Sequence, residues 1–521
     1  MRSEGDALKF NSGELPIAAD GRPSLALSAS KVLLPAKAIT QKLFDTLEQQ
    51  GINYCHWKSN IRLEKTLAGS EDIDILVDRR DAGRLDAVLL AGGFKLAQSR
   101  SGVSHPGVFH AIGLDDVTAE LVDVHAYFQV VSGDSLVKNY CFPIEDALLD
   151  RARYLNGVRV PAPEAELVVF ALRIALKHIS PVEILKANRR YWKISQEMAW
   201  LRNAANGEAT EMLCAKWFPS IDTALFRQLL NAIEDDRAVL RRVFLGLRVA
   251  RRLRNLRRLS VFSAMTSRYW RLLSFLVGRF RRRRDLALQT GGMIVALVGP
   301  KGTGKSTLGH ELAARLSKHL DVTRIHAGKP PTTMLSILPR QFIPIARSLL
   351  PNERLAEYEK PERRSGRRYS LLHVVRMTLV AFDRHKLLRR AHRAAAAGTI
   401  VISDRYPSET VGASDSSCFD DIAVENCGSR LKRWLMTKER AFYRALPRPH
   451  LVLRLVAPVD TAVQRDALRS KMGGPNAEAV RRRWERESHG EFPGTRVIEI
   501  DTSLSLDDTL RNVVRTVWGA L

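Results

Sequence analysis

The residues with the clearest chemical meaning lie in the stretch ALVGPKGTGKSTLGHEL, residues 296–312. Gly299, Gly304, Lys305 and Ser306 fit the spacing GxxxxGKS, which is typical of a loop that holds a phosphate chain. Glycines let the backbone curl so that several N–H groups point at one phosphate, and the helix that follows presents its positive dipole end to the anion. We expect Lys305 to reach the β and γ phosphates and Ser306 to ligate Mg²⁺ through its hydroxyl.

The predicted ligands of this loop are ATP and Mg²⁺. The residues expected to bind the nucleotide are Gly299, Lys301, Gly302, Thr303, Gly304, Lys305, Ser306 and Thr307. The alternative is a glycine-rich turn that binds nothing, but the loop lies between an apolar strand pattern and a helical pattern, as a phosphate loop requires. Because loops of this kind serve ATPases, GTPases, kinases and motors alike, the group that receives the phosphate has to be inferred from other residues.

A second reactive group follows in the stretch VISDRYPSE, which contains Asp404, Arg405 and Tyr406 at the end of an apolar strand pattern. In an open parallel sheet, ligands bind beyond the carboxyl ends of the strands. A carboxylate there can hold Mg²⁺ or orient an attacking oxygen, and an arginine can grip a phosphate with its planar fork. We expect Asp404 and Arg405 to act in catalysis, and Arg405 and Tyr406 to bind substrate. The alternative for this group is a surface salt bridge.

A third group of candidate residues lies near the N-terminus, in AGSEDIDILVDRRD. Asp72 and Asp74 are two residues apart on a predicted strand, so both side chains point to one face. Carboxylates on one face repel each other unless a cation lies between them, and Mg²⁺ is the usual cation. A second predicted strand, AELVDVHAYF, adds Asp123. These three residues are therefore predicted metal ligands, with solvated acids at a strand edge as the alternative.

These groups need separate scaffolds, and the 521 residues divide into four segments. Residues 1–30 are rich in Gly, Ser, Ala and Pro without periodicity, which predicts a disordered tail. Residues 31–190 alternate strand-like and helical runs, which predicts a small α/β domain. Residues 191–290 show helical patterns and no strand signal, which predicts a helical connector. In residues 291–521, apolar strands alternate with helices, which predicts an α/β fold with a parallel sheet, flanking helices and right-handed crossovers.

Positive charge is concentrated in the connector. The chain has 82 Lys and Arg against 56 Asp and Glu, a net charge of +26, and sixteen arginines with no acidic residue lie between Arg237 and Arg284. An apolar helical stripe lies beside these arginines, formed by Leu240, Val243, Phe244 and Leu247. A basic amphipathic segment predicts binding to an anionic membrane surface or to nucleic acid. The alternative is that the stripe packs on the rest of the chain and the arginines are solvated.

The sequence contains no predicted transmembrane segment. The best candidate, YWRLLSFLVGRF, is short and carries Arg271 and Arg279. The N-terminus has no apolar core of signal-peptide length. The five cysteines form no CxxC pair, which predicts free thiols in a reducing compartment. We therefore expect a cytoplasmic protein, with peripheral contact to a membrane surface through the basic connector.

Residues 291–521 resemble the thymidylate kinase family of nucleoside monophosphate kinases, because several stretches follow the phosphate loop in that family's order. TLVAFDRHKLL resembles the helix whose arginine contacts the acceptor nucleotide, which would be Arg384. VISDRY resembles the family's Asp-Arg-Tyr segment, and VIEIDTSLSLDDTLRNV its last strand and helix. RPHLVLRLVAPVDTAVQRDALRSK resembles its strand and lid, which places Arg465 and Arg469 in the lid. The resemblance implies that the lid arginines neutralise charge on the transferred phosphoryl group, and Lys301, inside the loop, is a candidate to assist them.

Two stretches depart from the family's pattern. RIHAGKPPTT stands where the family has Arg-Glu-Pro-Gly, and PSETVGASDSS stands where the family has a Ser-rich, Tyr-Gln segment against the acceptor. The donor side therefore matches better than the acceptor side. A nucleoside monophosphate is the expected acceptor, and another phosphorylated or hydroxylated molecule is the alternative.

The first α/β domain resembles the polymerase-β-like nucleotidyltransferase superfamily, whose pattern is a Gly-Ser turn, a helix, Asp-x-Asp and a later acid. Ser59, in HWKSN, precedes Asp72 by thirteen residues, but Lys58 replaces the small residue of the turn. The resemblance implies nucleotidyl transfer with Mg²⁺, and Arg173 and Lys177 are candidates to meet a triphosphate. The combination of both domains resembles bacterial thymidylate-kinase-like proteins linked with cell-surface polysaccharide synthesis.

Two functions therefore remain open from the sequence. In the first, the chain is a kinase that transfers phosphate from ATP to a small acceptor, with a second nucleotidyltransferase activity. In the second, it is an ATP-dependent switch or ATPase that the connector anchors to a membrane or to nucleic acid. The two differ in the acceptor-binding residues Arg384, Asp404 and Arg405, which a switch does not need.

Overall fold

In the computed structural model, Ala36–Leu521 form one compact unit. The predicted disordered tail, residues 1–30, lies outside the described residues. The structure describes residues 35–99, 105, 107–180, 183–184, 191–280, 286–337, 341–342, 369–413, 415–469 and 490–521.

A six-stranded mixed sheet forms the N-terminal part of this unit, in the strand order β1-β2-β5-β4-β3-β10. Its strands are β1 (Tyr54–His56), β2 (Ile73–Val77), β3 (Lys95–Ser99), β4 (Val108–Asp115), β5 (Glu120–Tyr127) and β10 (Leu286–Leu288). Only β2 and β5 pair in parallel, and the other neighbours in this sheet are antiparallel. The accompanying helices are α1 (Ala38–Gln49), α2 (Leu63–Leu67), α3 (Ala82–Ala91) and α4 (Glu145–Asp150). Two short hairpins follow, β6 (Val130–Ser132) with β7 (Tyr140–Phe142) and β8 (Ala152–Leu155) with β9 (Val158–Pro161).

The strand β10 departs from the sequence-based expectation. Helical patterns predict no strand in residues 191–290, yet Leu286–Leu288 pair antiparallel with β3. A strand of three residues is too short to show alternation, so its conformation follows from pairing with β3 and from burial of Ala287 and Leu288. The prediction of helix throughout this segment is therefore wrong at its end.

The connector is otherwise helical where it is described. The helix α5 (Pro163–Lys177) precedes the connector. The helices of the connector are α7 (Tyr191–Ala204), α8 (Gly207–Trp217), α9 (Thr223–Glu234), α10 (Val239–Arg252) and α11 (Val261–Phe280). Pro163 begins α5, where its missing N–H has no partner to lose. α5 contacts α7, α8, α9 and α10, so these helices share one core. Among the described helices, none combines the length and the apolar character needed to cross a bilayer.

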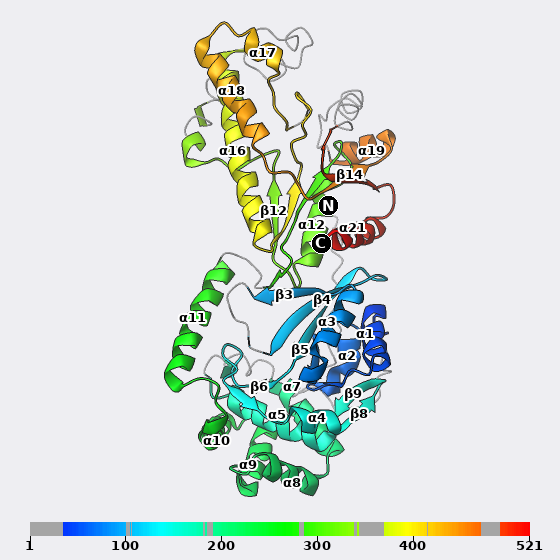
Figure 1. Ribbon diagram of the computed structural model, residues 1–521, viewed down its shortest axis with the longest axis vertical. Helices are drawn as coiled ribbons and strands as arrows, with labels where there is room; N and C mark the ends of the chain where they lie inside the picture. The colour runs from blue at the N-terminus through cyan, green and yellow to red at the C-terminus, as the bar shows by residue number, and fades with distance from the viewer. Residues whose placement is uncertain are drawn as a thin grey trace, which may run out of the picture. The chain divides into compact units, whose positions relative to one another are not determined.

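A five-stranded parallel sheet forms the C-terminal part, in the order β12-β13-β11-β14-β15 (Figure 1). Its strands are β11 (Ile294–Val298), β12 (Val322–His326), β13 (Ile400–Asp404), β14 (Leu451–Val456) and β15 (Arg496–Asp501). The helices are α12 (Lys305–Leu316), α16 (Leu371–Ala396), α17 (Asp421–Glu425), α18 (Arg430–Arg444), α19 (Val459–Arg469) and α21 (Leu506–Ala520). α16 and α18 lie side by side in Figure 1.

Helices cover both faces of the parallel sheet, which explains its continuous apolar strands. On β11, Ile294 and Ala296 share a buried cluster with Leu388 of α16, whereas Val295 and Leu297 share another with α12 and α21. The carboxyl ends of β11 and β13 meet at one edge, because Leu297 and Asp404 are paired in register. The fold therefore brings the glycine-rich loop and the Asp-Arg-Tyr segment to the same edge.

Candidate functional site

The glycine-rich loop follows β11 and leads directly into α12. Gly299 has φ +138°, and a Cβ atom there would lie 2.4 Å from the Leu455 carbonyl oxygen, so the loop requires glycine at this position. Gly304 caps α12 with φ +85°. The Lys305 side chain is buried and its Nζ donates hydrogen bonds to the carbonyl oxygens of Gly299 (2.8 Å) and Pro300 (2.6 Å). The ammonium group is thus held inside the curve of the loop, where a phosphate chain would bind.

The two residues expected to hold Mg²⁺ on this side of the chain lie in direct contact. Ser306 Oγ donates a hydrogen bond of 2.6 Å to Asp404 Oδ2. Ser306 lies in the first turn of α12, and Asp404 ends β13. A hydroxyl and a carboxylate at this distance offer two oxygen ligands to one magnesium ion, which prefers oxygen and keeps several waters.

Arg384 and Arg405 are joined by one carboxylate that the sequence did not single out. Asp415 Oδ1 lies 3.1 Å from Arg384 Nη2, and Asp415 Oδ2 lies 3.1 Å from Arg405 Nη1. Arg405 and Asp415 both have positive φ, +72° and +66°. Non-glycine residues rarely adopt this conformation, so both backbones are held in place by their surroundings.

Arg384 lies on α16 and is 3% exposed. Its Nε donates to the Ala327 carbonyl oxygen at 2.7 Å, and its Nη1 donates to the Asp415 carbonyl oxygen at 2.7 Å and to the Tyr443 hydroxyl. The guanidinium therefore ties the end of β12 to the Asp415 segment. Arg405 is more accessible, with 26% of its side chain exposed.

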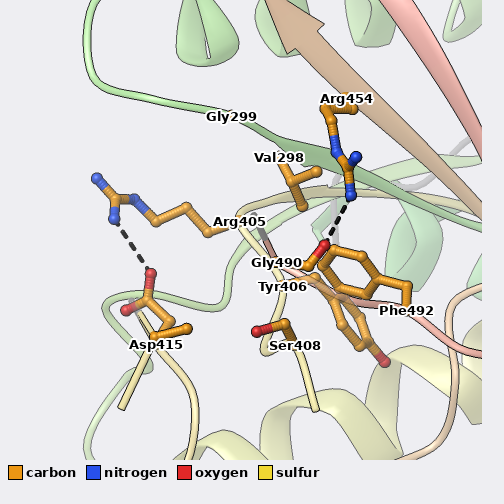
Figure 2. A pocket seen from close by; sticks show the side chains of 10 residues that line it. Val298, Gly299, Arg405, Tyr406, Ser408, Asp415, Arg454, Gly490 and Phe492 are labelled. Atoms are coloured by element: carbon orange, nitrogen blue, oxygen red, sulfur yellow. Dashed lines mark hydrogen bonds and ion pairs between the residues drawn. The ribbon is translucent and has the colours of Figure 1, made fainter. Parts of the chain in front are cut away.

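Figure 2 shows a pocket at one side of which Arg405 and Asp415 are joined by their ion pair. It is lined by Val298, Gly299, Arg405, Tyr406, Ser408, Ala413, Asp415, Arg454, Gly490 and Phe492. Arg454 Nη2 donates to the Gly490 carbonyl oxygen at 2.7 Å, and the Tyr406 hydroxyl donates to the Pro447 carbonyl oxygen. Burial raises the pKa of Tyr406, so this phenol stays neutral. The pocket therefore combines arginines with aromatic side chains next to the start of the phosphate loop.

The opposite part of the loop lines another pocket. Its lining residues are Gly302, Thr303, Gly304, Thr307, Leu308, Arg465, Thr502, Leu504, Leu506 and Thr509. Arg465 lies on α19 and donates from Nη2 to the Thr502 carbonyl oxygen at 2.9 Å. Arg469 ends α19, and its side chain lies outside the described part of the chain. Residues of one loop thus line two pockets, each with an arginine.

A buried carboxyl group, that of Glu439, contacts the segment that follows Asp415, the partner of Arg384 and Arg405. Glu439 of α18 is 1% exposed and accepts hydrogen bonds from Ser417 Oγ and from the Cys418 backbone N–H, both at 2.8 Å. Burial, the largest effect, raises the pKa of Glu439 to about 7, although these donors oppose the shift. Glu439 therefore holds the segment that carries Asp415.

Sequence reasoning missed Asp415, Tyr443, Arg454 and Glu439. Asp415 lies within PSETVGASDSS, the stretch that departs from the thymidylate kinase pattern. Because this stretch stands where the family has its acceptor-facing segment, its acidic residue was a usable signal. Arg454 is the one charged residue in the otherwise apolar stretch HLVLRLVAP, which was a usable signal. Tyr443 and Glu439 carried no such signal, because polar residues are ordinary on an amphipathic helix.

In the N-terminal sheet, Asp72, Asp74 and Asp123 all lie near His125. His125 Nδ1 lies 3.2 Å from Asp74 Oδ1, and its Nε2 lies 3.3 Å from Asp123 Oδ2 and 3.8 Å from Asp72 Oδ2. Asp74 also forms an ion pair of 2.7 Å with Lys58. Burial alone would raise the pKa of Asp74, but Lys58 and His125 hold it well below its usual range. The three predicted ligands are therefore together, with cationic side chains among them.

A pocket connects this group to the other residues of the nucleotidyltransferase resemblance. Its lining residues are His56, Lys58, Ser59, Thr66, Ser70, Glu71, Asp72 and Asp74. Ser59 has φ +60°, so it lies at a tight turn. Arg173 stacks over Trp57, with 5.2 Å between the guanidinium carbon and the ring centre, and Lys177 lies 3.6 Å from Glu183. Neither of the two basic residues is among the lining residues of this pocket.

The fold and the loop together define the class of the C-terminal region. A parallel α/β sheet, whose central strand β11 leads through a GxxxxGKS loop into a helix, is the fold of P-loop nucleoside triphosphatases. The N-terminal part is a smaller α/β unit, and helices connect the two.

Comparison with known proteins yields distant relatives. No protein-family model matches the chain. The uncharacterized ATP-binding protein YghR of Escherichia coli K12 is 27% identical over 229 residues, which cover 43% of this chain and 86% of YghR. The uncharacterized ATP-binding protein YghS of the same strain is 24% identical over 248 residues, covering 46% of this chain and 99% of YghS. Among solved structures, thymidylate kinase from Candida albicans is 17% identical with a TM-score of 0.25, over 44% of this chain and 91% of that chain.

Proposed function

We propose that the C-terminal region transfers the γ-phosphoryl group of ATP to a small acceptor, with a nucleoside monophosphate as the first candidate. The observation that carries this proposal is the contact of 2.6 Å between Ser306 and Asp404, next to the loop that encloses Lys305. ATP as the donor agrees with the description of YghR and YghS as ATP-binding proteins. Bound Mg²⁺ would supply charge neutralisation on the β and γ phosphates.

The acceptor pocket favours a kinase over an ATP-dependent switch. A switch needs the loop and the metal ligands but no second anion site. Here Arg405 and Arg454 line a pocket that also includes Val298 and Gly299, at the start of the loop. Two bound anions repel each other, and arginines beside them remove part of that barrier while holding the reacting groups close together.

Asp415 gives the acceptor site a simple way to recognise an anion. It holds Arg384 and Arg405 through its two carboxylate oxygens, each at 3.1 Å. We propose that a phosphate of the acceptor competes with this carboxylate for the guanidinium groups, because both anions match the arginine fork. Tyr406 then forms part of the pocket wall. Arg465 and Arg469 are proposed to approach the transferred group from α19.

The proposal is tested by offering the full-length protein labelled ATP and a mixture of small metabolites, followed by mass spectrometry of newly phosphorylated molecules. We expect one acceptor class to gain a phosphate and to stimulate ATP consumption. Equal ATP consumption with and without acceptors, with no phosphorylated product, would support the ATPase switch instead.

For the N-terminal sheet we propose a second, separate activity: nucleotidyl transfer with Mg²⁺ held by Asp72, Asp74 and Asp123. The supporting observation is the pocket shared by Ser59, Asp72 and Asp74. The test is incorporation of labelled nucleoside monophosphate from a labelled triphosphate, with the Asp72→Asn and Asp74→Asn double variant as control. Absence of incorporation by the parent protein with every candidate acceptor would reject this activity.

We also propose that α11 binds the surface of an anionic membrane, because the helix exposes its apolar side. Phe262, Met265, Tyr269 and Trp270 are 61–77% exposed. The other side of the helix contacts the segment between β6 and β7: Arg268 Nη2 lies 2.7 Å from Asp134 Oδ2, and Arg271 donates to the Leu136 carbonyl oxygen. Aromatic side chains of this kind favour the interface of a bilayer.

Charge supports a lipid partner for this surface. α10 exposes Leu240, Phe244 and Leu247, at 54–86%, on a helix that also carries exposed arginines. Each basic residue near an anionic lipid surface contributes about 1 kcal/mol, and nucleic acid offers nothing for the apolar side chains. The combination of exposed apolar groups with exposed arginines therefore fits lipid better than nucleic acid.

Co-sedimentation with vesicles tests this partner. We expect binding to vesicles that contain phosphatidylglycerol, weakening with salt, and little binding to neutral phosphatidylcholine vesicles. Phe262→Ser with Trp270→Ser should weaken binding several-fold, while the exposed Trp434 of α18 provides the control Trp434→Ser. No binding at low salt rejects the membrane, and equal binding of duplex DNA by parent and variant would indicate nucleic acid.

A further inference from the structure

We propose that the N-terminal sheet binds a first-row divalent transition-metal ion through His110, Asp123 and His125. One ligand atom from each of these residues lies within 4.8 Å of the others. Asp72, Asp123 and His319 meet the same limit. This site is independent of phosphoryl transfer by the C-terminal region. It shares Asp123 with the magnesium site proposed for nucleotidyl transfer and is an alternative to that site, because imidazoles rather than Asp72 and Asp74 supply its other ligands.

The register of the sheet builds the site. His125 on β5 pairs with Asp74 on β2 on one side and with His110 on β4 on the other. Asp123 lies two residues before His125, so both side chains point to the same face. The rings of His110 and His125 have centres 4.3 Å apart. The three ligands therefore come from two adjacent strands, and strands hold side-chain positions well.

The separations match those of metal ligands. His110 Nδ1 lies 3.5 Å from Asp123 Oδ1, and His125 Nε2 lies 3.3 Å from Asp123 Oδ2. Ligands about 2.1 Å from a tetrahedral metal ion lie about 3.4 Å from one another. A metal ion at this position would require only small side-chain rotations.

Two of the atoms have unsatisfied hydrogen-bonding capacity. His110 Nδ1 and Asp123 Oδ1 are buried and face each other at 3.5 Å, and neither forms a hydrogen bond among the described residues; Asp123 is 6% exposed. A buried carboxylate oxygen without a partner is costly and rare in native proteins. Binding of a cation by both atoms would remove this cost.

The surrounding groups favour a transition metal over Mg²⁺. Imidazole nitrogens suit zinc and its neighbours, whereas Mg²⁺ prefers oxygen ligands in an octahedron. His125 Nδ1 lies 3.2 Å from Asp74 Oδ1, so His125 can present Nε2 to a metal while a carboxylate orients its ring. Asp74 already has a cationic partner in Lys58, at 2.7 Å, which assigns it to this supporting role.

His319 offers a fourth ligand from the P-loop region. It lies in the turn after α12, and its Nδ1 is 3.8 Å from Asp123 Oδ2. Asp72 is half exposed at 51% and leaves an open side toward solvent, by which an ion can enter. A metal bound by both Asp123 and His319 would strengthen the contact between β5 and the end of α12.

The test uses the full-length protein after chelator treatment and dialysis, titrated with Zn²⁺ and with Mg²⁺ by calorimetry, and with Co²⁺ by absorption. We expect one Zn²⁺ ion per chain, a Co²⁺ spectrum with intensity typical of a low-coordinate site, and no competition by excess Mg²⁺. His110→Ala should weaken Zn²⁺ binding by roughly tenfold or more, and His319→Ala should weaken it less. His392, which is exposed on α16, provides the matched control His392→Ala.

Circular dichroism of the metal-free variants checks that each one folds. Since His110 is 31% exposed, its replacement leaves most of the core packing intact. Zn²⁺ binding that is unchanged by both His110→Ala and Asp123→Asn would overturn the proposal. Preferential binding of Mg²⁺, lost in Asp72→Asn with Asp74→Asn but retained in His110→Ala, would also overturn it and would restore the carboxylate-only site.

Discussion

Ser306 donates a hydrogen bond of 2.6 Å to Asp404, although 98 residues separate them in the chain. Ser306 lies in the first turn of α12 and Asp404 ends β13, and the parallel pairing of β11 with β13 brings them to the same edge of the sheet. Their oxygens therefore form a ready pair of metal ligands beside the phosphate loop.

Removal of either oxygen is expected to weaken the response to Mg²⁺. Ser306→Ala and Asp404→Asn should each raise the Mg²⁺ concentration for half-maximal ATP consumption by roughly tenfold or more, because each removes or weakens a ligand. The double variant should lose less than the sum of both effects, since they share one ion. Ser317→Ala, in the turn after α12, is the control. Unchanged Mg²⁺ dependence in both single variants would contradict the assignment.

Lys305→Ala is expected to lower turnover about 100-fold or more, because the ammonium stabilises charge that develops on the donor phosphates. ATP binding should fall much less than turnover. Steady-state kinetics together with a direct measurement of ATP binding separate the two effects. Lys318→Ala, at an exposed lysine beyond the same helix, should behave as the parent protein. Equal losses in binding and turnover would point to a purely ground-state contact.

Arg405→Ala is expected to raise the acceptor concentration for half-maximal rate about 10- to 100-fold, as for the loss of a charge-assisted hydrogen bond. ATP binding should remain close to that of the parent protein, because Arg405 lines the proposed acceptor pocket and not the pocket formed by Gly302, Thr303 and Gly304. Arg448, which is 64% exposed, supplies the control Arg448→Ala. Identical acceptor responses of parent and Arg405→Ala would exclude this residue from the acceptor site.

Asp415→Asn is expected to increase the affinity for inorganic phosphate or pyrophosphate in the absence of ATP. The substitution keeps the shape but removes the negative charge that Arg384 and Arg405 share. Asn also tolerates the positive φ of this position, so the backbone should be retained. Calorimetry with both proteins measures the change. A lower anion affinity in Asp415→Asn would show that the carboxylate organises the arginines rather than competing with the ligand.

Glu439 predicts a pH-dependent stability. Its pKa is about 7 in the folded protein and 4.5 for an unperturbed carboxyl, so the folded state binds more protons between these values. The free energy of unfolding should therefore fall as pH rises from about 4.5 to about 7. Glu439→Gln should match the parent near pH 4 and be more stable by roughly 3 kcal/mol near pH 8. Urea unfolding followed by tryptophan fluorescence tests this difference, with exposed Glu425→Gln as control. A variant less stable at both pH values would refute the prediction.

Local patterns determined the elements that carry the chemistry. The strands β2, β5, β11 and β13 lie where apolar strand patterns predicted them. The strands β14 and β15 and the helix α16 lie where the resemblance to thymidylate kinases implied them. The GxxxxGKS spacing predicted a glycine-rich turn between strand and helix, and Gly299 and Gly304 adopt the positive φ that such a turn needs. These features are readable because burial on one face, or on both, imposes a period on neighbouring residues.

Only the tertiary structure decided which side chains meet. Nothing in the sequence around Asp415 predicted that its carboxylate would join Arg384 and Arg405, and nothing around His110 predicted a place beside His125 and Asp123. The strand β10 likewise exists because β3 offers it an edge. Such contacts depend on strand order and register between segments distant in the chain, and the periodicity of one segment carries no information about its partner.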